Sequence, residues 1–76
     1  MEKAYILISC EIGQENELLS QLQKIKEISN VMITYGDYDI VAEAETENAK
    51  IMDELITSKI RKFNKIRSTI TLRVTC

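Results

Sequence analysis

The residues best suited to binding a ligand form one short segment, Tyr35-Gly36-Asp37-Tyr38-Asp39. Exposed backbone N–H groups beside a glycine attract a carboxylate, and the carboxylate of Asp39 or Asp37 pairs with an ammonium group. The segment therefore suits a small zwitterion. It also suits an ordinary hairpin turn, in which Gly36 gives the backbone freedom, Asp37 binds local N–H groups and the tyrosines cover the sheet. Spacing alone leaves both interpretations open.

Two hydroxyl groups near the C-terminus are further candidates for the same site. Thr69 and Thr71 occupy alternate positions of an apolar–polar run, so their side chains lie on one face of a strand. Their hydroxyls would add hydrogen bonds to a bound ligand. They are equally suited to be ordinary β-branched strand residues at a subunit interface.

Catalysis and metal binding find little support in the composition. The chain has no histidine, which is the most frequent general base and metal ligand. Gly13 and Gly36 are its only glycines, so there is no glycine-rich phosphate loop. Cys10 and Cys76 are far apart and resemble neither a zinc motif nor a disulfide framework. We therefore expect no enzyme, no metal and no cofactor, and we expect Cys10 to be an unreactive core residue.

Charge and hydropathy exclude other classes of function. The net charge is -2 and the pI is about 5.1, which argues against direct nucleic-acid binding. The apolar run Ala4–Cys10 is too short to span a membrane and lacks a signal-peptide pattern. We expect a cytoplasmic protein. Its 76 residues form one small domain, for which a partner subunit is a usual source of stability.

Hydrophobic periodicity defines the first half of that domain. Residues 3–12 are rich in β-branched and aromatic types, which predicts a strand ending before Gly13. An amphipathic helix is predicted over residues 14–28, with Leu18, Leu22 and Ile25 on its apolar side.

The second half repeats the alternation of strand and helix. Strands are predicted over residues 31–35 and 38–44, joined by a short turn at Gly36-Asp37. Thr46 is the expected N-cap of a second helix, from about residue 47 to 62. A last strand is predicted over residues 66–74.

This order predicts an α+β ferredoxin-like βαββαβ sandwich, with two helices on one face of an antiparallel four-stranded sheet. The uncovered sheet face is expected to mix apolar and hydroxyl groups, and another subunit is expected to cover it. Its expected members are Tyr5, Leu7, Ser9, Val41, Thr69 and Thr71.

Three strings in this order resemble a known family. They are A-Y-I-L-I-S-C-E-I, then V-M-I-T-Y-G-D-Y-D-I-V-A-E-A, and after a helix I-R-S-T-I-T-L-R-V. Over about residues 3 to 75 they are similar to the RAM domain, the effector-binding domain of the Lrp/AsnC regulators. The most specific parts are Gly36-x-Tyr38-Asp39 and the segment Ser68–Leu72.

The resemblance implies an amino-acid effector as partner. It further implies dimers that pair through their sheets and assemble into higher oligomers, octamers included, with effector clefts between dimers. Carried over by position, the ligand-binding residues are Gly36, Asp37, Tyr38, Asp39, Thr69 and Thr71. Full-length members carry an N-terminal helix-turn-helix, whereas this sequence starts just before its first strand. The implied protein is a stand-alone domain over residues 1–76 that senses an amino acid and joins a full-length Lrp/AsnC paralogue.

Three other functions remain open. An ACT-type domain has the same βαββαβ order, also binds amino acids and usually has a glycine turn after its first strand, where Gly13 stands here. The Gly36-Asp37-Tyr38-Asp39 hairpin, however, fits the RAM pattern better. A small ferredoxin-like dimeric enzyme would need a polar pocket between sheet and helices, which the apolar helix-facing positions do not indicate. The third alternative is an assembly partner that binds no ligand.

Overall fold

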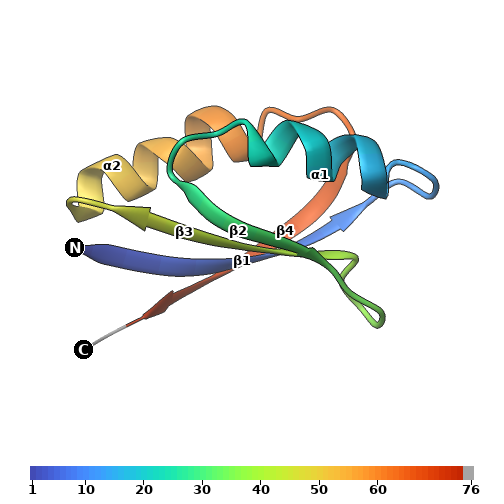
Figure 1. The fold of residues 1–76 in the computed structure, drawn as a ribbon, viewed down its shortest axis with the longest axis horizontal. Helices are drawn as coiled ribbons and strands as arrows, with labels where there is room; N and C mark the ends of the chain where they lie inside the picture. The colour runs from blue at the N-terminus through green and yellow to red at the C-terminus, as the bar shows by residue number, and fades with distance from the viewer. Residues whose placement is uncertain (75–76) are drawn as a thin grey trace.

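The computed structural model, which describes residues 1–74, is a four-stranded antiparallel sheet with two helical segments on one face (Figure 1). The predicted ferredoxin-like βαββαβ fold is confirmed. Strands in the sheet follow the order β2-β3-β1-β4. In chain order the elements are β1 (Glu2–Cys10), α1 (Glu15–Gln23), β2 (Ile28–Ile33), β3 (Ile40–Thr46), α2 (Ala49–Glu54), the π-helix η1 (Leu55–Ile60) and β4 (Ile66–Val74). Cys76 lies outside the described residues.

Strand β1 is paired on both sides, with β3 and with β4, and its alternation divides the molecule into two faces. Ala4, Ile6 and Ile8 are fully buried under the helices, whereas the residues between them are partly exposed on the other side. Strand β3 repeats this pattern from Ile40 to Thr46. A period of two along both strands therefore defines one apolar layer, as expected for a half-covered antiparallel sheet.

The helices close this layer with residues at helical spacing. From α1 come Leu18 and Leu22, and from α2 comes Met52, all of them with no more than 1% of their surface exposed. Segment η1 adds Leu55 and Ile60 to the same core. The core thus lies between the helices and the inner face of β1 and β3.

Helix α1 ends at Gln23, five residues before the predicted end at Ile28. Its last turn tightens, because the N–H groups of Lys24 and Ile25 donate to the carbonyls of Gln21 and Leu22, three residues earlier. Ile28 is buried and pairs with Ala44 of β3, so it begins β2. Pairing with the neighbouring strand, which helical periodicity does not reveal, decides this boundary.

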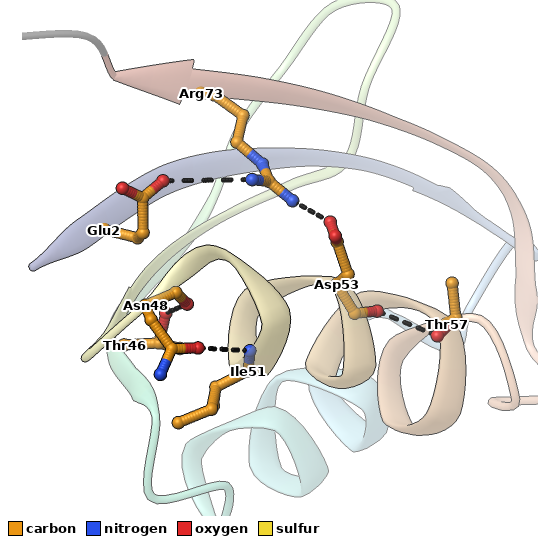
Figure 2. Close-up of polar contacts among 7 residues, drawn as sticks. All are labelled: Glu2, Thr46, Asn48, Ile51, Asp53, Thr57 and Arg73. Atoms are coloured by element: carbon orange, nitrogen blue, oxygen red, sulfur yellow. Dashed lines mark hydrogen bonds and ion pairs between the residues drawn. The ribbon is translucent and has the colours of Figure 1, made fainter.

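The N-cap of the second helix is Asn48, and the prediction of Thr46 was wrong. Thr46 is the last residue of β3, where it pairs with Glu2, and its hydroxyl donates to the carbonyl of Asn48 over 2.8 Å. The side-chain oxygen of Asn48 accepts a hydrogen bond from the N–H of Ile51 at 2.9 Å (Figure 2). Strand pairing therefore displaces the start of the helix by two residues.

The predicted single helix of residues 47–62 consists of two parts, because η1 is a π-helix. The N–H of Arg61 donates to the carbonyl of Ile56, five residues earlier. The hydroxyl of Thr57 donates to the carbonyl of Asp53, so this side chain shares an acceptor of the helical ladder. π-Helical turns inside helices occur often near functional sites.

Besides the ladder with β1, a guanidinium connects β4 to helix α2. Arg73 forms ion pairs with Asp53 of α2 and, over 3.8 Å, with Glu2 of β1 (Figure 2). Arg73 opposes Ala4, which is buried under the helices, so it lies on the helix-side face. The edge strand is in this way attached to α2 by a polar contact.

We expect Asn48→Ala to lower the free energy of unfolding by about 1 kcal/mol, since the N–H of Ile51 loses its acceptor. Urea denaturation followed by circular dichroism measures this change. Asn64→Ala is the matched control, because Asn64 is exposed and makes no side-chain hydrogen bond within residues 1–74. Equal stability of the two variants would contradict the capping role.

Candidate ligand-binding site

The candidate ligand-binding segment is a six-residue loop, Thr34–Asp39, and not the two-residue turn that the sequence predicts. Strand β2 ends at Ile33 and β3 begins at Ile40, so both tyrosines belong to the loop. Thr34 closes its base: its N–H donates to the carbonyl of Asp39 and its hydroxyl to that of Tyr38, both at 2.8 Å. The loop extends beyond the sheet at one end (Figure 1).

The tip of this loop presents free backbone donors. Within residues 1–74, the N–H groups of Tyr35, Gly36, Asp37 and Tyr38 have no hydrogen-bond partner. Gly36 has a φ of +133°, which residues with side chains rarely adopt. Nothing lies within 4 Å of the position that a Gly36 side chain would occupy. The loop therefore offers donors to an anionic group but encloses nothing by itself.

Asp39 differs from its neighbours because it is bound inside the chain. Its carboxylate oxygen Oδ2 accepts a hydrogen bond from the N–H of Cys10 at 2.9 Å, and its own N–H donates to the carbonyl of Ile8 at 2.9 Å. Cys10 stands where the pairing of β1 with β4 shifts register. Asp39 thus accepts a hydrogen bond from the N–H of Cys10, at the point where the ladder between β1 and β4 is irregular.

Cys10 is a buried core residue, as its place in an apolar run predicts. Burial raises the pKa of its thiol, and the negative charge of Asp39 raises it further. Both effects disfavour the thiolate, which is the reactive form. The thiol is therefore unsuited to nucleophilic chemistry beside the loop.

Thr69 and Thr71 are not on the open sheet face, where the sequence pattern placed them. Thr69 opposes Ile8 and Thr71 opposes Ile6, and directly opposed residues of antiparallel strands share a face. Both isoleucines point to the helices, so both threonines do too. Apolar–polar alternation identified the two faces of β4 but not which of them meets the helices, and the register decides this.

The two threonines and the loop lie on opposite sides of β1. Ile8 pairs with Ile40 of β3 on one side and with Thr69 on the other, which separates Thr69 from β3 by about 10 Å. Thr71 lines a depression of about 320 Å³ together with Asp53 and Thr57, and no residue of the loop lines it. One chain therefore brings Gly36, Asp37, Tyr38 and Asp39 together but leaves the threonines apart from them.

The open face is more apolar than predicted, because β4 directs its large side chains to it. Tyr5, Leu7, Ser9 and Val41 are there, as expected from their alternation with buried residues. Strand β4 adds Ile70 and Leu72, which oppose Leu7 and Tyr5 and are 43% and 51% exposed. Further apolar members of this face are Met32, opposite Val41, and Val74, opposite Lys3.

One ion pair interrupts this surface. The ammonium of Lys3 lies 2.6 Å from Oε2 of Glu43, which also accepts the Tyr5 hydroxyl at 3.5 Å. The hydrogen bond with Glu43 raises the pKa of Lys3 above its ordinary value. The charges therefore stay paired at one end of a face that is otherwise apolar.

Fold and loop together define a small α+β domain of ferredoxin-like type, with unpaired backbone donors at one end of its sheet and an apolar face on residues 1–74. Comparison with known proteins identifies the family. The family model of the Lrp/AsnC ligand binding domain matches residues 3–75. The chain belongs to this family, whose models describe the ligand-binding part of transcriptional regulators, and the predicted resemblance is confirmed.

Curated relatives include the HTH-type transcriptional regulators FL11 of three Pyrococcus species. The protein from Pyrococcus furiosus is 38% identical over 53 residues, which cover 70% of this chain and 35% of the relative. That from Pyrococcus horikoshii is 36% identical over the same length. The chain thus matches about a third of the length of these relatives.

Solved structures agree closely with the fold. FFRP-DM1 has a TM-score of 0.96 and 35% identity, and the match covers 99% of this chain and 100% of that one. A hypothetical protein of Pyrococcus horikoshii, PHS023, has a TM-score of 0.96, 34% identity and coverages of 100% and 92%. The NMB0573/L-Met complex of Neisseria meningitidis, a transcriptional regulator, shares the fold at a TM-score of 0.88 with 13% identity, over 99% of this chain and 50% of that one.

Within residues 1–74 no helix is long and apolar enough to cross a membrane.

We expect Asp39→Ala to lower the free energy of unfolding by about 1–3 kcal/mol, since the part-buried N–H of Cys10 loses its acceptor. Urea denaturation measures the loss. Asp39→Asn keeps an acceptor oxygen and should lose less. Asp37→Ala on the same loop is the control, because Asp37 is exposed and its carboxylate has no partner within residues 1–74. A stability of Asp39→Ala equal to that of the control would remove the structural role of Asp39.

Proposed function

We propose that this domain is an amino-acid-binding, oligomeric regulatory module of the Lrp/AsnC type, acting in the cytoplasm with transcriptional regulators. The observation that carries the proposal is the loop tip at Tyr35–Tyr38. Its four successive N–H groups have no partner in the described chain, and the family model assigns ligand binding to this domain. Backbone donors of this kind suit the carboxylate of an amino acid.

The two aspartates of the loop take different parts in this proposal. Asp37 is exposed and its side chain has no partner within residues 1–74, so it is the stronger candidate for the ammonium group. Asp39 uses Oδ2 for Cys10 and would offer only its second oxygen. Tyr38 is half-buried and would form the wall next to the ligand. Gly36 lets the backbone approach the ligand closely.

The proposed cleft needs a second chain. The loop alone is open, and Thr69 and Thr71 lie across β1 from it, so they would reach a ligand held by the loop of a neighbouring subunit. The apolar open face supports such assembly, because a face with Leu72 about half exposed is stabilised when another copy covers it. We propose a homodimer that packs sheet against sheet, with dimers joining into a higher oligomer.

We further propose that the domain works as a free-standing unit and adjusts a full-length Lrp/AsnC regulator by joining its assembly. The match to FFRP-DM1, which spans that whole chain, supports a unit of this size. An assembly role without any ligand is the second candidate, and the size of the apolar open face favours it equally.

The amino-acid proposal predicts thermal stabilisation by one amino acid or a related group. A ligand at about 100 times its dissociation constant adds about 2.7 kcal/mol, which raises the Tm of a domain this small by on the order of 10 °C. Thermal unfolding of the protein against each free amino acid measures the effect. Asp37→Asn should weaken binding of the effective amino acid about tenfold or more, because a charge-assisted bond is lost.

Glu54→Gln is the control for this experiment, because Glu54 is exposed, distant in the fold and equally without a partner in residues 1–74. It removes the same charge and should leave binding unchanged. If no amino acid at millimolar concentration raises the Tm, the ligand-free assembly role replaces the sensor.

The sheet-to-sheet dimer predicts that Leu72→Lys dissociates the protein, since a charge would enter a covered apolar surface opposite Tyr5. Sedimentation at micromolar concentration should show the mass falling from dimer or larger to monomer. Thr71, which the sequence pattern placed on this face, faces the helices and is therefore unsuited to this test.

Ile12→Lys is the matched control for Leu72→Lys. Ile12 is 94% exposed in the turn after β1, so the same added charge lies outside the sheet face. Ile12→Lys should keep the mass of the parent protein. An unchanged mass for Leu72→Lys would exclude the open face as the interface.

A further inference from the structure

Positive charge is concentrated in one short stretch of this acidic protein. Residues 59–67 hold five of the ten lysines and arginines of the chain and none of its twelve acidic residues. The stretch covers the end of η1, the following turn and the start of β4. Lys59 pairs with Glu27 over 3.4 Å. The other four cations are exposed and make no ion pair within residues 1–74.

A depression of about 360 Å³ lies within this stretch. Its lining residues are Arg61, Ile66, Arg67, Ser68 and Thr69. In the described chain, neither guanidinium and neither hydroxyl of this set has a side-chain hydrogen-bond partner. The lining includes no carboxylate. A depression lined by charge of one sign concentrates anions, because nothing in its wall neutralises the field.

A β-bulge places one of the two arginines. Ser9 opposes Ser68 and Cys10 opposes Ile66, so Arg67 is an extra residue in β4 without an opposite partner. Bulges redirect side chains and occur often beside functional sites. The N–H of Glu11 donates to the carbonyl of Lys65 over 2.9 Å, and the carboxylate of Asp39 binds Cys10, so the bulge is held on both sides.

We propose that this depression binds the phosphoryl group of a small phosphorylated molecule, held by the guanidiniums of Arg61 and Arg67 and the hydroxyl group of Thr69, which lies on the helix side with Arg61. Guanidinium groups match phosphate oxygens in a fork of paired N–H bonds. Two fixed positive charges balance a dianionic phosphate, whereas a single carboxylate would leave one of them unneutralised. One chain holds all three residues, so this site requires no second subunit.

A nucleic-acid strand fits this surface less well than a small molecule. Outside residues 59–67 the chain has twelve acidic against five basic residues, and that charge repels a long polyanion. The basic surface is confined to one turn at one end of the sheet. A ligand with one phosphate fits this extent.

Titration with inorganic phosphate tests the site, with backbone amide shifts in 1H–15N NMR spectra as the measurement. Ionic strength is held constant with chloride, and acetate is titrated in parallel. We expect saturable shifts confined to about residues 61–69. Acetate should bind at least tenfold more weakly than phosphate. The double variant Arg61→Gln/Arg67→Gln should lose the response to phosphate by at least tenfold.

Lys24→Gln/Lys50→Gln is the matched control, because both lysines are exposed and the change in net charge is the same. It should bind phosphate as the parent protein does. Equal losses in both double variants, equal binding of acetate, or no saturable shift would each overturn the proposal. Tighter binding of a single-stranded oligonucleotide, with a steep dependence on salt, would also overturn it in favour of a nucleic-acid surface. Because no amino acid is added and Thr69 is unchanged, failure here is distinct from failure of the amino-acid proposal.

Discussion

The pairing of β1 on both of its sides is the constraint on which the rest of the structure depends. Every second residue of this strand is buried under the helices, and both neighbouring strands must match that alternation. A shift of one residue would exchange the two faces of a strand. The position of each candidate side chain, on the helix side or on the open face, therefore follows from its partner in β1. This is how Thr69 and Thr71 come to lie opposite Ile8 and Ile6.

The hydrogen bond from Cys10 to Asp39 connects folding to the proposed binding site. It joins the loop after β2 to the end of β1, at the place where the ladder with β4 loses its register. A buried donor without an acceptor is costly, so this carboxylate stabilises the irregularity. The same carboxylate therefore has one oxygen fewer for a ligand. The loop thus separates its tasks: Asp39 fixes the base, and Gly36 and Asp37 remain free at the tip.

Under the proposed function, a single chain is incomplete in two respects. Its open face carries Ile70 and Leu72, which are about half exposed, and its candidate loop is open around Gly36. In the proposed assembly, one copy would cover the apolar face and a subunit of a neighbouring dimer would supply a wall for the ligand. The core of a domain of 76 residues is small. Contacts between copies would therefore stabilise the fold and also help to hold the ligand. The basic depression beside Arg67 differs, because a single chain forms it.

The sequence by itself determined the order of strands and helices, the fold class, the family and the presence of a turn at Gly36-Asp37, because period-two and helical alternation and turn residues are local properties. The tertiary structure alone decided the rest. The early end of α1 and the cap at Asn48 follow from strand pairing, because Ile28 pairs with Ala44 and Thr46 pairs with Glu2. Neither residue is then available to the neighbouring helix. Which face of β4 meets the helices, the role of Asp39 and the meeting of Arg61 with Arg67 depend on contacts between residues distant in the chain. Local patterns carry no information on such contacts, because register across strands is set by the whole sheet.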